Sequence, residues 1–171
     1  MKFIADRMLG KLAKGLRMLG YDTIYYQGDD LHQLIHMARH DGRVILTRNT
    51  KLIPRNPEDR IFKVTEDNPH NQLRQLIDKG PVPLNVEKFF CRCLLCNVLL
   101  DQIPREKAEG NVPDFVFHQQ KEFFQCPQCR RIYWPGTHQK NMQRFLKELQ
   151  ISDRELQDER SEIQNLKSEI G

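Results

Sequence analysis

The sequence lacks any apolar run long enough to cross a membrane. Its 171 residues are 39% hydrophobic and 29% charged, and no uninterrupted apolar segment approaches the roughly 20 residues of a transmembrane helix. The N-terminus also lacks the apolar stretch of a secretory signal, because Asp6 and Arg7 interrupt it. These absences argue against a membrane protein and predict a cytoplasmic one.

Cysteine is scarce, and its count is odd. Five cysteines leave one thiol unpaired in any disulfide scheme, and the cytosol keeps thiols reduced. Metal binding is therefore the favoured use of these cysteines. The chain also lacks internal repeats and low-complexity tracts, so we expect one ordinary domain, or a small domain with an accessory module.

Short apolar runs alternate with helical periodicity along residues 1–88. The runs at 2–5, 22–26, 44–47 and 61–65 predict strands, and the residues between them predict helices. Strands that alternate with helices indicate a parallel sheet covered on both faces. We predict an α/β domain over residues 1–88, a β-rich zinc ribbon over 89–140 and a charged helical tail over 141–171.

Two CxxC motifs predict a structural zinc site. They are formed by Cys93 with Cys96 and by Cys126 with Cys129. Each such turn presents two thiolates to one ion, and four thiolates fill the tetrahedral sphere of zinc, so no position stays open for catalysis. Residues 112–117 are expected to supply strands of the ribbon. The alternative is four reduced, buried cysteines.

Cys91 has two interpretations that the spacing does not separate. It is either a bystander or an alternative zinc ligand, because it lies close to the first motif. Downstream of the second motif, Arg131 and Trp134 are candidates for phosphate contact and base stacking. Tyr133 and Trp134 have an alternative role, which is to pack the ribbon against the first domain.

Carboxylates follow several of the predicted strands. In a parallel sheet the ligand site lies at the carboxyl ends of the strands, and here those ends carry Asp6, Asp30, Asn49 and Asp67. Carboxylates that converge there are suited to Mg²⁺ or Mn²⁺, which activates water and neutralises phosphate charge. Each acid also has a structural alternative. Asp6 and Asp30 are potential helix N-caps, and Asp67 is placed to complement a helix dipole.

Basic residues accompany the first helix. The chain has a formal net charge of +4, a mild preference for polyanions. Arg7, Lys11 and Lys14 lie along or beside this helix, and Arg48 follows the third predicted strand. We expect these four residues to contact a nucleic-acid backbone; a solvated helix face is the alternative for those on the helix.

The C-terminal tail carries one apolar stripe. Its apolar residues recur every seven positions, and they are Met142, Leu149, Leu156, Ile163 and Ile170. The companion positions include polar residues, so the stripe favours a solvated helix or docking onto a protein partner over a self-sufficient coiled coil.

Several motifs, taken in order, resemble one family. These motifs are residues 6–13, residues 16–23, Ile45-Leu46-Thr47-Arg48, the two CxxC motifs and residues 133–138. Together they resemble the PIN-like group named after the C-terminal RNase domain of the animal Mut-seven exonucleases, over roughly residues 1–145. The resemblance implies a PIN-like three-layer domain joined to a zinc ribbon, and a metal-dependent ribonuclease acting on RNA.

The resemblance also implies where a catalytic Mg²⁺ or Mn²⁺ would lie. By position the metal carboxylates would be Asp6, a residue at or near Asp30, the residue after Thr47-Arg48, and Asp67. The residue after Thr47-Arg48 is usually aspartate in this family, whereas this chain has Asn49. An amide lacks the negative charge on which the affinity of such a site depends. The expected activity is therefore endoribonuclease cleavage, and the alternative is an RNA-binding module for tRNA, rRNA or a ribonucleoprotein.

Overall fold

The structure is a computed structural model that describes residues 1–136 and Arg144, apart from positions 53, 55, 58, 81, 86 and 87. Its contacts group Met1–Tyr133 as one compact unit and Trp134–Gly171 as a second. The predicted tail helix, with its apolar stripe, lies outside the described residues. The predicted domain boundaries at 88/89 and 140/141 stay predictions. Among the described residues, no helix has the length and apolar character needed to cross a membrane.

A parallel sheet forms the centre of the first unit. Its strands are β1 (Lys2–Ala5), β2 (Asp22–Tyr25), β3 (Val44–Thr47) and β4 (Ile61–Lys63), in the order β2-β1-β3-β4. All neighbours are parallel. The α/β fold class predicted from the sequence is confirmed, although β4 ends two residues earlier than expected.

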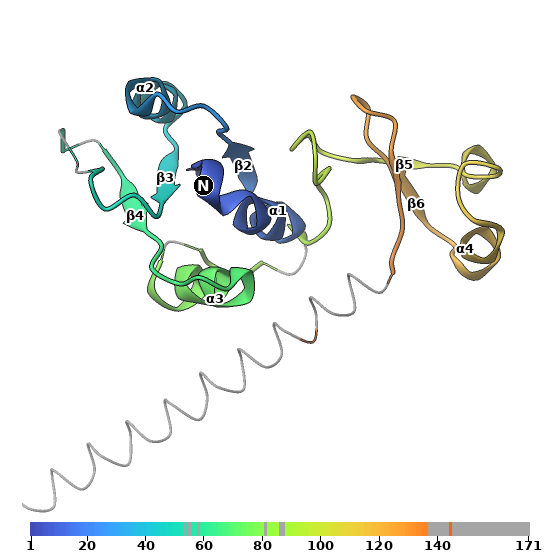
Figure 1. Cartoon of the computed structure of the whole chain (residues 1–171). Helices are drawn as coiled ribbons and strands as arrows, with labels where there is room; N and C mark the ends of the chain where they lie inside the picture. The colour runs from blue at the N-terminus through green and yellow to red at the C-terminus, as the bar shows by residue number, and fades with distance from the viewer. Residues whose placement is uncertain are drawn as a thin grey trace, which may run out of the picture. The chain divides into compact units, whose positions relative to one another are not determined.

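Helices cover both faces of this sheet. In Figure 1, α2 (Leu31–Asp41) lies on one side, and α1 (Gly10–Met18) and α3 (Pro69–Lys79) lie on the other. A short 3-10 turn, η1 (Arg7–Leu9), precedes α1. Asn68 caps α3 with Pro69 at its first turn, and Gly42 ends α2 in the left-handed conformation.

The strand alternation divides the core between the two faces. Ile4 of β1 and Ile45 of β3 belong to a buried cluster with Leu34 and Ala38 of α2. Phe3 is fully buried as well, and its side chain points to the opposite face because neighbouring residues in a strand alternate. The apolar runs of the sequence therefore produce a sheet that is buried on both sides.

A smaller antiparallel sheet follows in the chain. It consists of β5 (Asp101–Ile103), β6 (Phe123–Gln125) and β7 (Ile132–Tyr133), and the connection between β5 and β6 contains η3 (Arg105–Lys107) and α4 (Asp114–Gln119).

The prediction of strands over residues 112–117 is wrong, because α4 occupies most of that segment. Pro113 is the N-cap residue of α4, and Asp114 places a carboxylate in its first turn, where it favours the helix dipole. The ring of Phe117 stacks on Phe123 of β6 at 6.3 Å between centroids. Phe117 therefore packs from a helix onto the small sheet, whereas Phe115 is 64% exposed.

The first CxxC turn is bonded to the edge of the parallel sheet. Strand β2 is an edge strand, and an edge leaves backbone groups without a partner strand. The Thr23 N–H donates to Oδ1 of Asn97 at 2.9 Å, and the Thr23 carbonyl accepts from Nε of Arg17 at 2.9 Å. The guanidinium of Arg17 also donates to the carbonyls of Leu94 (2.7 Å) and Leu95 (3.0 Å). Arg17 therefore bridges α1, β2 and the CxxC turn.

Asp22 joins the same network from the strand. Its Oδ1 accepts from Nδ2 of Asn97 and from the buried guanidinium of Arg43, each at 2.7 Å. Burial raises the pKa of Asp22, but the hydrogen bonds from Arg43 and Asn97 outweigh it and hold that pKa below its usual range. The resulting stabilisation is complete above the usual aspartate pKa and is lost as the pH falls through the lowered folded-state pKa.

We predict that Asn97→Gly destabilises the protein by about 1–3 kcal/mol. Asn97 has a φ of 64°, which glycine adopts freely, so this substitution removes the side-chain contacts without straining the backbone. The Thr23 N–H would lose its acceptor. Thermal or urea unfolding measures the change. Asn111→Ala, at an exposed position of the ribbon, is the control, and an equal effect of both substitutions would contradict the docking role.

Candidate functional site

The four predicted zinc ligands lie together. The sulfur atoms of Cys93, Cys96, Cys126 and Cys129 are within 4.8 Å of one another. Cys93 and Cys126 are buried, whereas Cys129 is exposed. Four thiols at this spacing are the donor set of a structural zinc site. In the part of the chain that the structure describes, this is the sole group of three or more metal-binding side chains so arranged.

The two CxxC turns have the same local geometry. In each turn the second cysteine donates its backbone N–H to the first sulfur, at 3.3 Å for Cys96 and 3.4 Å for Cys129. The residue that follows each turn has a φ of 64°, and these residues are Asn97 and Arg130. Asparagine tolerates that conformation better than arginine does. The position after the second turn, where glycine is more usual, therefore holds a strained residue.

Tyr133 packs on the cysteine cluster. Its hydroxyl lies 3.1 Å from Sγ of Cys93 and accepts from the Leu94 N–H at 3.3 Å. Burial raises the pKa of Cys93, but the hydrogen bonds from Tyr133 and from backbone N–H groups outweigh it and lower that pKa to about 6. The hydroxyl therefore supports a thiolate ligand. Arg131 is exposed and Trp134 half-buried; their nucleic-acid contacts stay predictions.

Asp6 occupies the point where the sheet order reverses. The chain passes from β1 outward to β2, and then from β3 outward to β4, so the reversal lies between β1 and β3, where ligands of open α/β sheets bind. Asp6 follows β1 directly and is 8% exposed. Its carboxylate accepts from the N–H of Met8 (2.9 Å), the hydroxyl of Thr47 (2.5 Å) and the N–H of Arg48 (3.2 Å).

The other predicted acidic ligands each have a local partner. Asp30 caps α2 by accepting from the N–H groups of His32 and Gln33. Asp67 is exposed and forms an ion pair with Arg48. Within the described residues, Asp6, Asp30 and Asp67 do not form a group of close ligand atoms like that of the cysteines. Their catalytic assignment stays a prediction.

Asn49 stabilises the loop after β3. Its Oδ1 accepts from the Lys51 N–H at 2.9 Å, and its own N–H donates to the Thr47 hydroxyl at 2.9 Å. Lys63, at the end of β4, donates to the carbonyls of Asn49 and Leu52, each at 2.5 Å. Burial lowers the pKa of Lys63, and the charge of Asp6 partly offsets this. The Lys63 ammonium therefore holds the loop after β3 and is influenced by the charge of Asp6, and the sequence pattern, which placed Lys63 within a strand, did not reveal this role.

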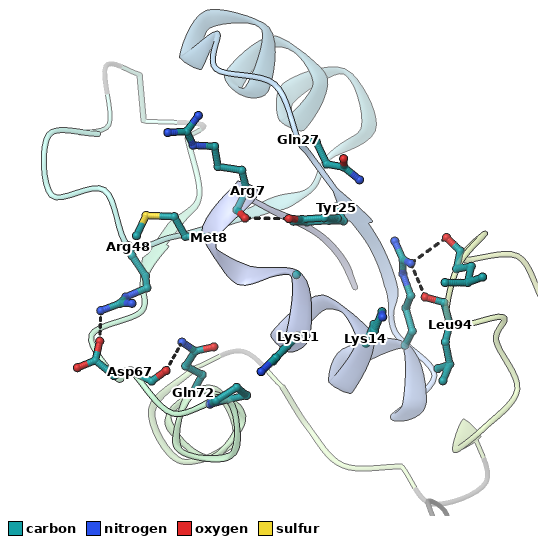
Figure 2. Close-up of a pocket in the computed structure, with 14 residues that line it drawn as sticks. Arg7, Met8, Lys11, Lys14, Tyr25, Gln27, Arg48, Asp67, Gln72 and Leu94 are labelled. Atoms are coloured by element: carbon teal, nitrogen blue, oxygen red, sulfur yellow. Dashed lines mark hydrogen bonds and ion pairs between the residues drawn. The ribbon is translucent and has the colours of Figure 1, made fainter.

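A basic groove is lined by Arg7, which follows Asp6 in the chain, and by Arg48, but not by Asp6 itself. It has a volume of about 690 Å³, and Figure 2 shows its lining. Five cationic side chains line it, against one carboxylate, that of Asp67; the cations are Arg7, Lys11, Lys14, Arg17 and Arg48. Four of the six residues predicted to contact nucleic acid therefore share one groove, and Arg131 and Trp134 are not among its lining residues.

Within the described residues, two of the five groove cations have neither an ion pair nor a side-chain hydrogen bond, whereas Arg17 donates to backbone carbonyls. Arg7 pairs with Asp29, and Arg48 pairs with Asp67. Across the described part of the chain, the ammonium groups of Lys11 and Lys14 form no hydrogen bond or ion pair. Uncompensated cations in a groove attract polyanions.

The fold and the two sites define a class of protein: an α/β domain with a four-cysteine cluster suited to zinc and a cationic groove lined by residues of its first helix. The chain matches the Mut7-C RNAse domain family over residues 1–146. It therefore belongs to that family, as the sequence motifs predicted, and it is a ribonuclease-like protein. No curated protein and no solved structure gave a significant match.

We predict about one equivalent of bound zinc in the purified protein, lost in Cys96→Ala. Cys91 lies outside the group of four sulfur atoms, so Cys91→Ser should retain the metal. Metal analysis by mass spectrometry after gentle purification measures both. Retention of zinc in Cys96→Ala, or its loss in Cys91→Ser, would show that the ligand set is different.

Proposed function

We propose that this protein binds RNA through the phosphate backbone in the basic groove. The observation that carries the proposal is the pair of unpartnered ammonium groups, Lys11 and Lys14, in a groove of a Mut7-C RNAse domain protein. A backbone laid along the groove would meet Arg7 and Arg48 as well. Each cation that neutralises a phosphate releases condensed counterions, which is the main source of sequence-independent affinity.

We further propose that the bound RNA is cleaved internally next to Asp6, with Mg²⁺ or Mn²⁺. Asp6 does not line the groove itself, but Arg7, which follows it in the chain, does, and so does Arg48, whose backbone N–H donates to the Asp6 carboxylate. A divalent ion there would activate water and neutralise charge on the phosphate. The Thr47 hydroxyl and the Arg48 N–H orient the Asp6 carboxylate, and this orientation would be the same for Mg²⁺ and for Mn²⁺.

The donor set around Asp6 is sparse for a divalent ion. Asp6 is a buried carboxylate and fits as one ligand, whereas the amide oxygen of Asn49 already accepts from the Lys51 N–H. Asp30 is engaged as a helix cap and Asp67 as the partner of Arg48. Because Mg²⁺ is bound through one or two carboxylates and keeps several waters, we expect weak metal affinity in the absence of RNA.

A second function is favoured by Asn49 and Lys63. The amide at position 49 removes a charge that the family pattern supplies, and the Lys63 ammonium already provides a cation near Asp6. Both features suit a protein that binds RNA, such as tRNA, rRNA or a ribonucleoprotein, without cleaving it.

Three further assignments are part of the proposal. We propose that the α/β domain is of the PIN type, that the protein is cytoplasmic, and that its C-terminal tail docks onto a protein partner.

The double substitution Lys11→Ala with Lys14→Ala should weaken binding to every RNA sequence tested. If both contact phosphates of a single strand, the slope of log K against log salt should fall by about 1.4. Fluorescence anisotropy over a salt series measures this slope. Lys107→Ala with Lys121→Ala, two exposed lysines of the ribbon, is the matched control. An unchanged slope in the groove variant would contradict the assigned contacts.

Cleavage of labelled RNA with Mn²⁺ or Mg²⁺ separates the two functions. We predict that the unmodified protein cleaves, that Asp6→Asn reduces cleavage at least about 100-fold, and that Asp101→Asn, at an exposed ribbon position, has no effect. Thermal unfolding of Asp6→Asn is needed alongside, because Asp6 also caps η1. If the unmodified protein does not cleave the RNA whereas Asn49→Asp does, the protein is instead an RNA binder that does not cleave.

A further inference from the structure

The first CxxC turn forms part of the groove as well as of the zinc site. Leu94 and Leu95, the two residues between Cys93 and Cys96, line the same groove as Lys11 and Lys14. Figure 2 shows Leu94 on one side of the groove, Arg48, Asp67 and Gln72 on the other, and the two lysines of α1 between them. The zinc ribbon therefore contributes an apolar wall to an otherwise cationic groove.

This wall is held firmly in place. The buried guanidinium of Arg17 donates to the carbonyls of both Leu94 and Leu95, and the Leu94 N–H donates to the Tyr133 hydroxyl. The flanking cysteines belong to the four-sulfur cluster. Because the backbone is fixed from three directions, the leucine side chains present a rigid surface, and little conformational entropy would be lost when a ligand packs on it.

Leu95 is exposed without a covering side chain. It is 45% exposed, and single exposed leucines are ordinary on protein surfaces. This one differs because it lies in the groove that the phosphate-binding cations define. A ligand whose charged backbone follows Lys11 and Lys14 would place its uncharged part against Leu94 and Leu95. An RNA strand has this composition, with phosphates on one edge and flat apolar base faces on the other.

We propose that the first zinc turn is a base-contacting wall, on which an unpaired base of the bound RNA packs against Leu95. The inference rests on the proposed RNA binding and adds the substrate class: single-stranded RNA or an unpaired loop. In a duplex the base faces are stacked and the A-form grooves present phosphates and 2′-hydroxyls instead. The groove volume of about 690 Å³ is within the range of pockets that hold small molecules.

The test compares three RNAs of about 12 nucleotides: a single strand, the same strand with central abasic sites, and a duplex. Fluorescence anisotropy gives the affinity of each for the unmodified protein, Leu95→Ala and Leu99→Ala. Leu99 is the matched control, since it is a second exposed leucine of the ribbon, 56% exposed, and does not line the groove.

The unmodified protein should prefer the intact single strand to the abasic strand and to the duplex. Leu95→Ala should lower affinity for the intact strand by about fivefold, while its affinity for the abasic strand stays the same. Leu99→Ala should change neither affinity. The salt dependence should be the same for all three proteins, because no phosphate contact is altered.

Three results would overturn the proposal, and they differ in what else they contradict. If Leu95→Ala lowers the affinity for the intact and the abasic strand equally, or lowers neither, then the base contact is wrong while RNA binding still stands. Tighter binding of the duplex than of the single strand shows recognition by shape. Absence of binding to all three RNAs at low salt contradicts the proposed function itself.

Discussion

The docking of the first CxxC turn on strand β2 is the interaction on which the rest of this structure depends. Arg17 and Asn97 satisfy the backbone of Thr23, and they tie the turn to α1 and to Asp22. An edge strand with exposed backbone groups invites pairing with other chains. Here the first CxxC turn bonds to that edge at Thr23, and its position brings Leu94 and Leu95 to the groove that Lys14 also lines.

Two cation sets therefore have different tasks in one small domain. The first set is buried in the docking network, where Arg17 and Arg43 compensate backbone carbonyls and Asp22. The second set faces the groove, where Lys11 and Lys14 have no anionic partner among the described residues. The first set maintains the fold, and the second is available to a polyanion. Asp6 belongs to neither set, and its carboxylate joins the end of β1 to the end of β3 through Thr47 and the Arg48 N–H.

Much of this arrangement was predictable from the sequence, because it depends on local patterns. The apolar runs predicted the four parallel strands, and the paired CxxC spacing predicted the sulfur cluster. The segment around Phe115 was misassigned, because a run of three consecutive apolar residues is too short to separate a strand from a helix. The positions of Lys63 and Asn97 were not predictable, since they depend on contacts between segments that are distant in the chain.

The central claim is that α1 and the first CxxC turn together form one RNA-binding groove. The most direct test is to photocrosslink the protein to single-stranded RNA that carries 4-thiouridine. Mass spectrometry then locates the crosslinked peptides. The account predicts crosslinks both on α1, near Lys11 and Lys14, and on the turn at Leu94 and Leu95. Crosslinks confined to α4 and the strands of the ribbon, with none on α1, would contradict it.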